Sequence, residues 1–281
     1  MSAVKRVAGV FPSYAWFVVL LVAPLVFIVV VSFCTVQDTW GYSFAFTAEN
    51  YSRLLDDSYA QIFAQSFLVA LVSTAGILAI GYPFAYFLTR IGDKWKLLAV
   101  ILTILPFIVS SVIRIYGWEI LLQSKGVINT LLINLHLIGE PVQLLYTNGA
   151  VVLGTVYTLL PVMVLPLYNS IERIDPALLQ AARDLGASSF QAFRDVTLRE
   201  SLPGIVSGCL LVFVPSIGLF YVSDMMGGSN TMLLGNLVKN QFVEMHNWPF
   251  GAALAVVMAV LTLACVLASK KLSGADRIEV F

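Results

Sequence analysis

The sequence predicts an all-α polytopic membrane protein, and two observations carry the prediction. The first is composition: 59% of the 281 residues are hydrophobic and only 11% are charged, whereas soluble domains carry about 25% charged residues. The second is a set of long apolar segments, each near the ~20 residues that a helix needs to cross a bilayer. We expect six transmembrane helices, at about 13–34, 62–89, 97–118, 149–170, 204–223 and 248–269.

Closed β-barrels are the other architecture that crosses a bilayer, and their strands show stretches of about ten residues that alternate apolar and polar side chains. The apolar segments of this chain are instead long and continuous, which favours helices. We expect a single transmembrane domain over residues 1–281, with a long inner loop at 171–203.

Lysine and arginine positions predict the orientation, because cytoplasmic loops carry an excess of these residues. With the N-terminus in the cytoplasm, only four of the 16 lysines and arginines fall outside or near the outer face: Arg53, Arg114, Lys125 and Lys239. The charge distribution therefore predicts that both termini are cytoplasmic.

Prolines interrupt four of the predicted helices, at Pro83, Pro106, Pro161 with Pro166, and Pro215. Each removes a backbone hydrogen bond and can kink its helix. Two interpretations stay open: the ordinary shape of membrane helices, which tolerate proline, and bent helices that line a cavity and rock.

Two further patterns concern packing and the membrane surface. Gly204 and Gly208 form a G-x-x-x-G step, which lets a second helix approach closely. The outer loop contains GVINTLLINLHLIG (126–139), an amphipathic stretch that we expect to lie along the membrane surface or to dip into it.

Motifs for catalysis and for ATP binding are absent from the sequence, which has no G-x-x-x-x-G-K-[ST], G-x-S-x-G or H-E-x-x-H. A net charge of zero offers no overall basic surface for nucleic acid. Cys34, Cys209 and Cys265 lack C-x-x-C spacing and indicate buried small hydrophobic residues. We therefore expect no catalytic residue, no metal site and no enzyme activity.

The loop at 171–203 reads as helix, turn, helix. Asp175 can cap free amides and Pro176 suits the first helical position, while Gly186 suits the residue just past a helix end. Ser188 or Ser189 can cap a second helix, whose apolar face is formed by Phe190, Phe193 and Val196. The loop is either an amphipathic surface segment without a partner or an element that docks in a groove of a cytoplasmic partner.

The same stretch, QAARDLGASSFQAFRDVTL, resembles the EAA loop of ABC-importer permeases, whose pattern is E-A-A, three residues, G, nine residues, then I-x-L-P. Two positions depart from the pattern: Gln180 replaces glutamate, which removes a charge, and Arg199 replaces the proline. Matching positions are Ala181, Ala182 and Gly186, with Val196 at the isoleucine position and Leu198 at the leucine position.

Nearly the whole chain resembles the permease subunit of spermidine/putrescine importers, the PotB type. The blocks that carry this resemblance are NYSRLL (50–55), GYPFAYFL (81–88), SSVIRIYGW (110–118), LLPVMVLPLYNSIERID (159–175), GLFYVSDMMGG (218–228) and NWPFGAA (247–253).

The resemblance implies a type I ABC-importer permease fold in the bacterial inner membrane. It implies three partners: a second homologous permease subunit, an ABC ATPase dimer and a periplasmic polyamine-binding protein. ATP and Mg would be bound by the ATPase, so this chain would hold no cofactor. The loop would couple the ATPase to the pore through Gln180, Ala181, Ala182, Asp184, Gly186, Ala187, Ser188, Phe190 and Phe193.

A pathway for polyamines would combine carboxylates with aromatic faces, because these cations are attracted by both. We expect Tyr221 and Asp224 at the outer end of one helix, and Tyr116, Trp118 and Glu119 at the outer end of another. For the two aromatic residues 116 and 118 an interfacial belt is the alternative, and for the two acids a solvated loop.

Three rival functions stay open beside a polyamine permease. One is an ABC-importer permease for another small solute. The second is a channel or carrier that works without an ATPase, and the third is a membrane scaffold that docks a cytoplasmic enzyme. The EAA-like loop argues against the last two.

Overall fold

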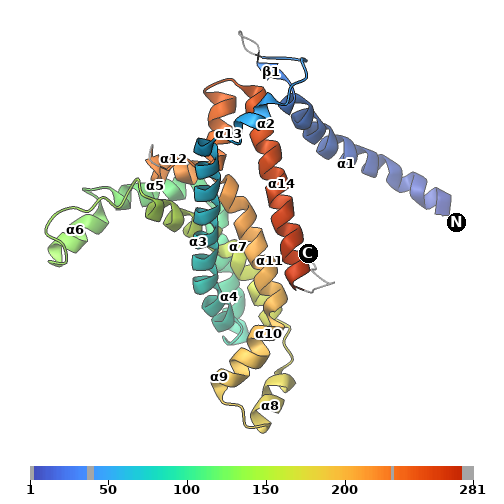
Figure 1. Cartoon of the computed structure of the whole chain (residues 1–281). Coiled ribbons are helices and arrows are strands. Elements are labelled where there is room, and N and C mark those ends of the chain that lie inside the picture. Colours follow the sequence, from blue (N-terminus) through green and yellow to red (C-terminus); the bar gives the residue numbers. More distant parts are fainter. Residues whose placement is uncertain (1–2, 37–40, 229–230, 274–281) are drawn as a thin grey trace. The chain divides into compact units, whose positions relative to one another are not determined.

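The computed structural model describes residues 3–36, 41–228 and 231–273 (Figure 1). Residues 1–2 and 274–281 lie outside this range, so the cytoplasmic side of the termini stays a prediction. The chain forms two compact units, one of residues 1–61 with 237–261 and one of residues 62–236 with 262–281. A single transmembrane domain over 1–281 likewise stays a prediction.

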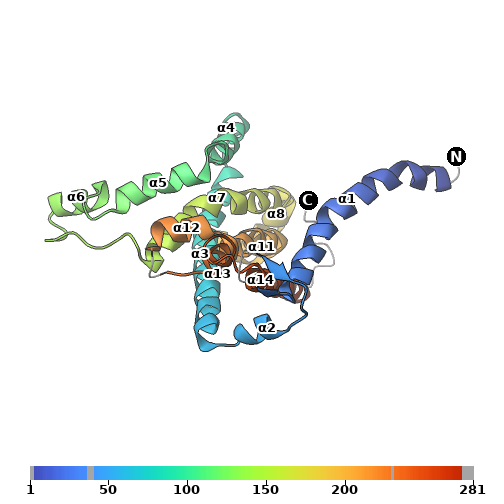
Figure 2. The same cartoon turned by 90° about the horizontal axis from the view of Figure 1, so that it is seen from above.

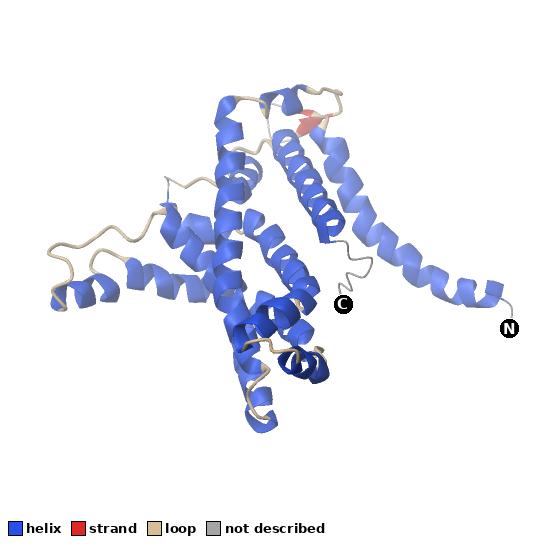
Figure 3. Ribbon diagram, turned by 60° about the horizontal axis from the view of Figure 1, so that its bottom comes forward, coloured by secondary structure: helices blue, strands red, loops and turns tan. Residues whose placement is uncertain are grey.

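The predicted all-α class is confirmed. Within the described residues, the one sheet is a two-stranded antiparallel pair of β1 (Thr35–Val36) and β2 (Tyr42–Ser43) (Figure 3). The long helices are α1 (Ala3–Ser32), α3 (Asp57–Leu88), α7 (Asn148–Glu172), α11 (Leu202–Gly218) and α14 (Trp248–Ser273). The shorter helices are α2 (Glu49–Arg53), α4 (Asp93–Ile104), the 3-10 turn η1 (Leu105–Ile108), α5 (Ser111–Leu122), α6 (Val127–Asn134), α8 (Pro176–Asp184), α9 (Ser189–Ala192), the π-helical turn η2 (Phe193–Thr197), α10 (Leu198–Glu200), α12 (Phe220–Met226) and α13 (Leu234–Val243).

The number of membrane spans differs from a simple count of six. Among the described residues, three helices are long and apolar enough to cross a membrane: α3, α7 and residues 248–269 of α14. The number rises to five only if each of two bent helix pairs counts as one span, and residues 16–32 of α1 form a shorter apolar helix. The six-span count therefore stays a prediction.

Two predicted spans are broken rather than straight. Between Lys94–Ile108 and Ser111–Asn134 the chain bends by 88°, because Pro106 lies in η1 and Val109 adopts an extended backbone that ends the helix. The predicted segment 204–223 breaks at Leu219, between α11 and α12. Prolines inside α3, α7 and α11 leave those helices continuous.

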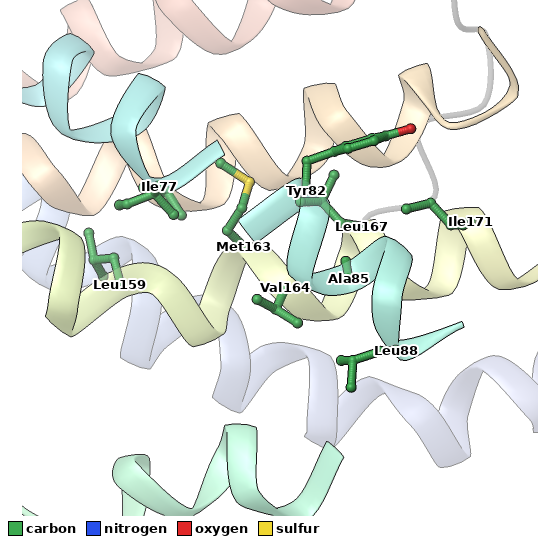
Figure 4. Close-up of a cluster of buried hydrophobic side chains, with 10 residues drawn as sticks. Ile77, Tyr82, Ala85, Leu88, Leu159, Met163, Val164, Leu167 and Ile171 are labelled. Carbon is green, nitrogen blue, oxygen red and sulfur yellow. The ribbon is translucent and has the colours of Figure 1, made fainter. Parts of the chain in front are cut away.

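The core of the second unit lies between α3, α7 and α11 (Figures 1 and 4). Apolar side chains from the three helices interlock there and exclude solvent, which stabilises their arrangement. The buried cluster consists of Ile77, Tyr82, Ala85, Leu88, Leu159, Met163, Val164, Leu167, Ile171 and Val212.

Helices α7 and α11 pack closely, and the G-x-x-x-G step lies at their contact. A Cβ atom on Gly204 would lie 2.3 Å from Cβ of Ser170, and one on Gly208 would lie 2.6 Å from Sδ of Met163. Only glycine permits this approach. Since α7 and α11 flank the loop at 171–203, the two ends of that loop are held by one tightly packed pair.

Candidate functional site

The first helix of the loop, α8, begins and ends as its sequence predicts. The Asp175 carboxylate accepts the backbone N–H of Ala177 at 2.8 Å, and Pro176 opens the helix. At the other end Gly186 has a φ of +87°, and the N–H of Ala187 donates to the carbonyl of Ala182 at 3.0 Å. This is a Schellman turn, which glycine forms without steric cost.

The second helix, α9, begins at Ser188, one of the two caps that the sequence allowed. The backbone N–H of Gln191 donates to Oγ of Ser188 at 3.3 Å, and the N–H of Ser188 donates to Oε1 of Gln191 at 2.8 Å. This reciprocal capping box fixes the start of the helix. The turn from Gly186 to Ser188 is thus defined on both sides.

The tip of the loop carries exposed apolar side chains. Leu185 is 89% exposed and Phe190 is 70% exposed, and α8 has no buried residue. Most residues expected to couple to an ATPase are exposed here, and three are partly covered. The exposed ones are Gln180, Ala181, Asp184, Gly186, Ser188 and Phe190; the partly covered ones are Ala182, Ala187 and Phe193.

Phe193 is partly covered, unlike the exposed Phe190, and its role in coupling stays a prediction. Its ring packs edge-on against Tyr82, with 6.0 Å between centroids, and against Tyr86, with 5.4 Å. Phe193 lies nearer the bundle, where the last turns of α3 supply these two rings. The loop is thereby anchored to α3.

A second contact attaches the base of the loop to α3. The hydroxyls of Tyr82 and Ser201 are 2.9 Å apart in a hydrogen bond, and the Ser201 side chain is buried. Nearby, the ammonium of Lys96 on α4 pairs with the carboxylate of Glu172 at the end of α7. Neither Tyr82 nor Ser201 was predicted as a coupling residue, since a tyrosine in an apolar run gives no signal of its partner.

On the loop surface Arg194 and Asp195 form an exposed ion pair, with Nε donating to Oδ1 at 2.8 Å. This hydrogen bond holds the pKa of the Asp195 carboxyl below its ordinary value. Such an exposed pair contributes little to stability, so the aromatic and hydroxyl contacts carry the anchoring.

A cavity of about 840 Å³ opens where α7, α8 and α11 meet. Its charged lining comes from Arg173, Asp175 and Glu200, and its apolar lining includes Leu178 and Leu211. The predicted substrate residues do not line it. The cavity therefore extends from the base of the loop along α7 and α11.

Two of the residues expected in a substrate pathway, Trp118 and Tyr221, pack against the same buried cluster. This cluster is formed by buried side chains that include Ile115 of α5 and Val222 of α12. Trp118 also meets the ring of Tyr157 edge-on, with 5.7 Å between centroids. The predicted aromatic residues thus come from α5 and α12, and Tyr157 of α7 joins them.

The two acidic residues differ in their exposure. Asp224 is exposed on α12 and accepts a hydrogen bond from the Asn236 side chain, while Glu119 is partly buried on α5. Tyr116 is 55% exposed and lies on the side of α5 opposite Trp118. The geometry therefore places Tyr116 on the opposite side of α5 from Trp118, whereas Glu119, three residues after Tyr116, lies nearer the side of Tyr116.

Arg114 is an unexpected neighbour of the aromatic cluster. Its guanidinium carbon lies 5.5 Å from the ring centroid of Tyr157, and its buried Nε and Nη1 have no hydrogen-bond partner among the described residues. Sequence reasoning noted the charge but missed Tyr157, which looks like any aromatic residue of a membrane helix.

An all-helical membrane chain with a rigidly anchored, apolar-tipped loop between two helices has the architecture of a transport-system membrane subunit. The chain belongs to the family of binding-protein-dependent transport system inner membrane components, whose model matches residues 7–273. This membership confirms the predicted multi-pass location in the inner membrane.

Relatives and solved structures agree with this family. The spermidine/putrescine transport system permease protein PotB of Escherichia coli (strain K12) is 44% identical over 268 residues, which cover 94% of this chain and 98% of that protein. The PotB of Salmonella typhimurium (strain SL1344) is 45% identical over 262 residues, covering 92% and 91%. These identities confirm the resemblance to the PotB type.

The fold matches a crystal structure of the bacterial alginate ABC transporter in complex with alginate pentasaccharide-bound periplasmic protein. The TM-score is 0.77 at 16% identity, covering 96% of this chain and 95% of the other. At this identity the match establishes the importer-permease fold only.

Proposed function

We propose that this chain is a pore-forming permease subunit of an ATP-driven importer for polyamines such as spermidine and putrescine. The observation that carries the proposal is the 44–45% identity, along almost the whole chain, to permease proteins of spermidine/putrescine transport systems. The alginate transporter supports the fold but not the solute, because its identity to this chain is only 16%.

The proposed complex contains this chain, a second homologous permease subunit, an ABC ATPase dimer and a periplasmic polyamine-binding protein. ATP and Mg bind to the ATPase, and this chain needs no cofactor. The family description, which names a binding-protein-dependent transport system, supports the periplasmic partner.

Coupling is proposed to run through the loop at 171–203. Leu185 and Phe190 at the exposed tip are suited to insert into a groove of the ATPase, as in helix-in-groove recognition. Movement of the tip reaches α3 through Phe193 and its two tyrosine contacts. It reaches α7 and α11 through their direct connections to the loop.

Trp118, Tyr221, Asp224 and Glu119 are the proposed contacts of the substrate. An ammonium group over an aromatic ring gains about 0.5–2 kcal/mol, and the two carboxylates supply charge pairing. The shared cluster of Trp118 and Tyr221 supports this assignment. Tyr116 is left out because its side chain lies on the side of α5 opposite Trp118.

Uptake into liposomes tests the proposal. Radiolabelled spermidine is supplied with its binding protein outside, and ATP is trapped inside with the ATPase on the same side. We expect uptake that needs ATP and that unlabelled putrescine reduces. Uptake without ATP would favour a channel or carrier. ATP-driven uptake of a different solute, without uptake of spermidine, would show that the chain is an importer permease with another substrate.

A further inference from the structure

The helices α5 and α6 carry a continuous apolar stripe that the proposed function does not use. Within α5 the members lie three or four residues apart, and within α6 and its C-cap they lie four residues apart, so each set shares one face of its own helix. Each is between 55% and 65% exposed: Ile113, Tyr116, Ile120, Val127, Leu131 and Leu135.

The opposite face of the same helices is buried, and it fixes the rotation of the stripe. Ile115, Leu122 and Asn129, spaced by seven residues, are at most 6% exposed. The Asn129 side chain donates to the carbonyl of Gln123 at 3.1 Å and to that of Val142 at 3.0 Å, and it accepts the N–H of Val142 at 3.0 Å. The stripe therefore points away from the protein.

The direction of this arm follows from the bend before it. Residues 111–134 run at 88° to residues 94–108, which form an apolar segment. Figure 1 shows α5 and α6 running sideways from the upright α3, and Figure 2 shows them following one line. For residues 94–108 aligned with the membrane normal, an arm at 88° to them lies in the plane of the membrane.

The depth of the arm follows from the length of α4 and η1. Residues 94–108 rise about 22 Å at about 1.5 Å per residue, which is less than the ~30 Å of hydrocarbon. Since Lys94 lies on the predicted cytoplasmic side, the arm begins in the outer leaflet. It then lies below the headgroups, within the depth that interfacial helices occupy.

We propose that α5 and α6 form an interfacial arm whose stripe binds lipid at the boundary of headgroups and acyl chains in the outer leaflet. The stripe continues the exposed apolar surface of the preceding segment, where Ile101, Leu105 and Ile108 are exposed. Lys125, exposed at the break between the helices, can reach lipid phosphates while its stem stays on apolar surface. This inference goes beyond the proposed function and does not depend on which solute is carried.

Nitroxide labels on the full-length chain in the assembled transporter test the arm. The native cysteines are first replaced by alanine, and Tyr116→Cys and Leu131→Cys then place labels on the stripe. Glu140→Cys is the control, because Glu140 is exposed in the loop after α6, outside both helices. The transporter is embedded in bilayers of phosphatidylethanolamine and phosphatidylglycerol.

Collision of each label with oxygen, which partitions into lipid, is compared with collision with a water-soluble nickel chelate. We expect labels at 116 and 131 to favour oxygen by several-fold more than the label at 140. Stripe labels that favour the nickel chelate would overturn the proposal by placing the stripe in water. Stripe labels shielded from both reagents would overturn it by placing a protein surface there, such as the second permease subunit.

Discussion

Replacing Phe193 by alanine should uncouple ATP hydrolysis from uptake while leaving the ATPase bound. The ring of Phe193 makes two edge-on contacts, with centroid distances of 6.0 Å to Tyr82 and 5.4 Å to Tyr86. Each aromatic pair contributes about 0.5–1.5 kcal/mol, so the loop loses about 1–3 kcal/mol of attachment to α3. A free energy of this size changes an equilibrium by about 5- to 150-fold.

The assay measures spermidine molecules imported per ATP hydrolysed, together with the affinity of the ATPase for the permease. Phe190→Ala is the matched control, because Phe190 lies three residues away and is 70% exposed at the loop tip. Phe193→Ala should lower the transport ratio at unchanged affinity, whereas Phe190→Ala should lower affinity. If both variants weaken ATPase binding equally, Phe190 and Phe193 do not have the separate roles of binding the ATPase and attaching the loop to α3.

Three further outcomes follow from the same geometry. Gly204→Ala should lower the melting temperature of the chain far more than Gly117→Ala, because a Cβ at 204 meets α7 at 2.3 Å while one at 117 meets nothing within 4 Å; equal melting temperatures would contradict the close packing. Tyr82→Phe should cost about 0.5–1.5 kcal/mol by deleting its hydrogen bond to Ser201, an effect that should vanish in a Ser201→Ala background. Asp224→Asn should weaken spermidine uptake with little change in ATPase binding, and unchanged uptake would remove Asp224 from the substrate pathway.

Local signals predicted the loop well. Asp175, Gly186 and Ser188 act on backbone groups within a few residues, so their roles as caps and turn residues could be predicted from sequence alone. The same holds for the G-x-x-x-G step, where the absence of side chains allows close approach.

Contacts between distant segments could not be predicted in this way. Tyr82 and Ser201 are 119 residues apart, and no periodicity pairs them. An apolar residue such as Phe193 suits both a groove on a partner and the tyrosine rings of α3, so the sequence pattern could not distinguish the two. The 88° bend needed more than Pro106, since prolines elsewhere leave their helices continuous.

The proposed substrate residues could be predicted only in part. Aromatic and acidic side chains at two helix ends indicated candidates, and α5 and α12 indeed bring Trp118 and Tyr221 to one cluster. Which face of α5 each residue occupies depended on the packing of Ile115, which turns Tyr116 away.

The most direct test of ATP-driven coupling through the loop is spermidine uptake by a Gly186→Val transporter. Gly186 has a φ of +87° and open space around it, so a β-branched residue strains the turn by about 1–3 kcal/mol without a steric clash. Gly92→Val is the control, because Gly92 also has open space but a φ of −62°. We predict that ATP-dependent uptake falls sharply in Gly186→Val and persists in Gly92→Val. Equal uptake in the two variants would contradict coupling through this loop.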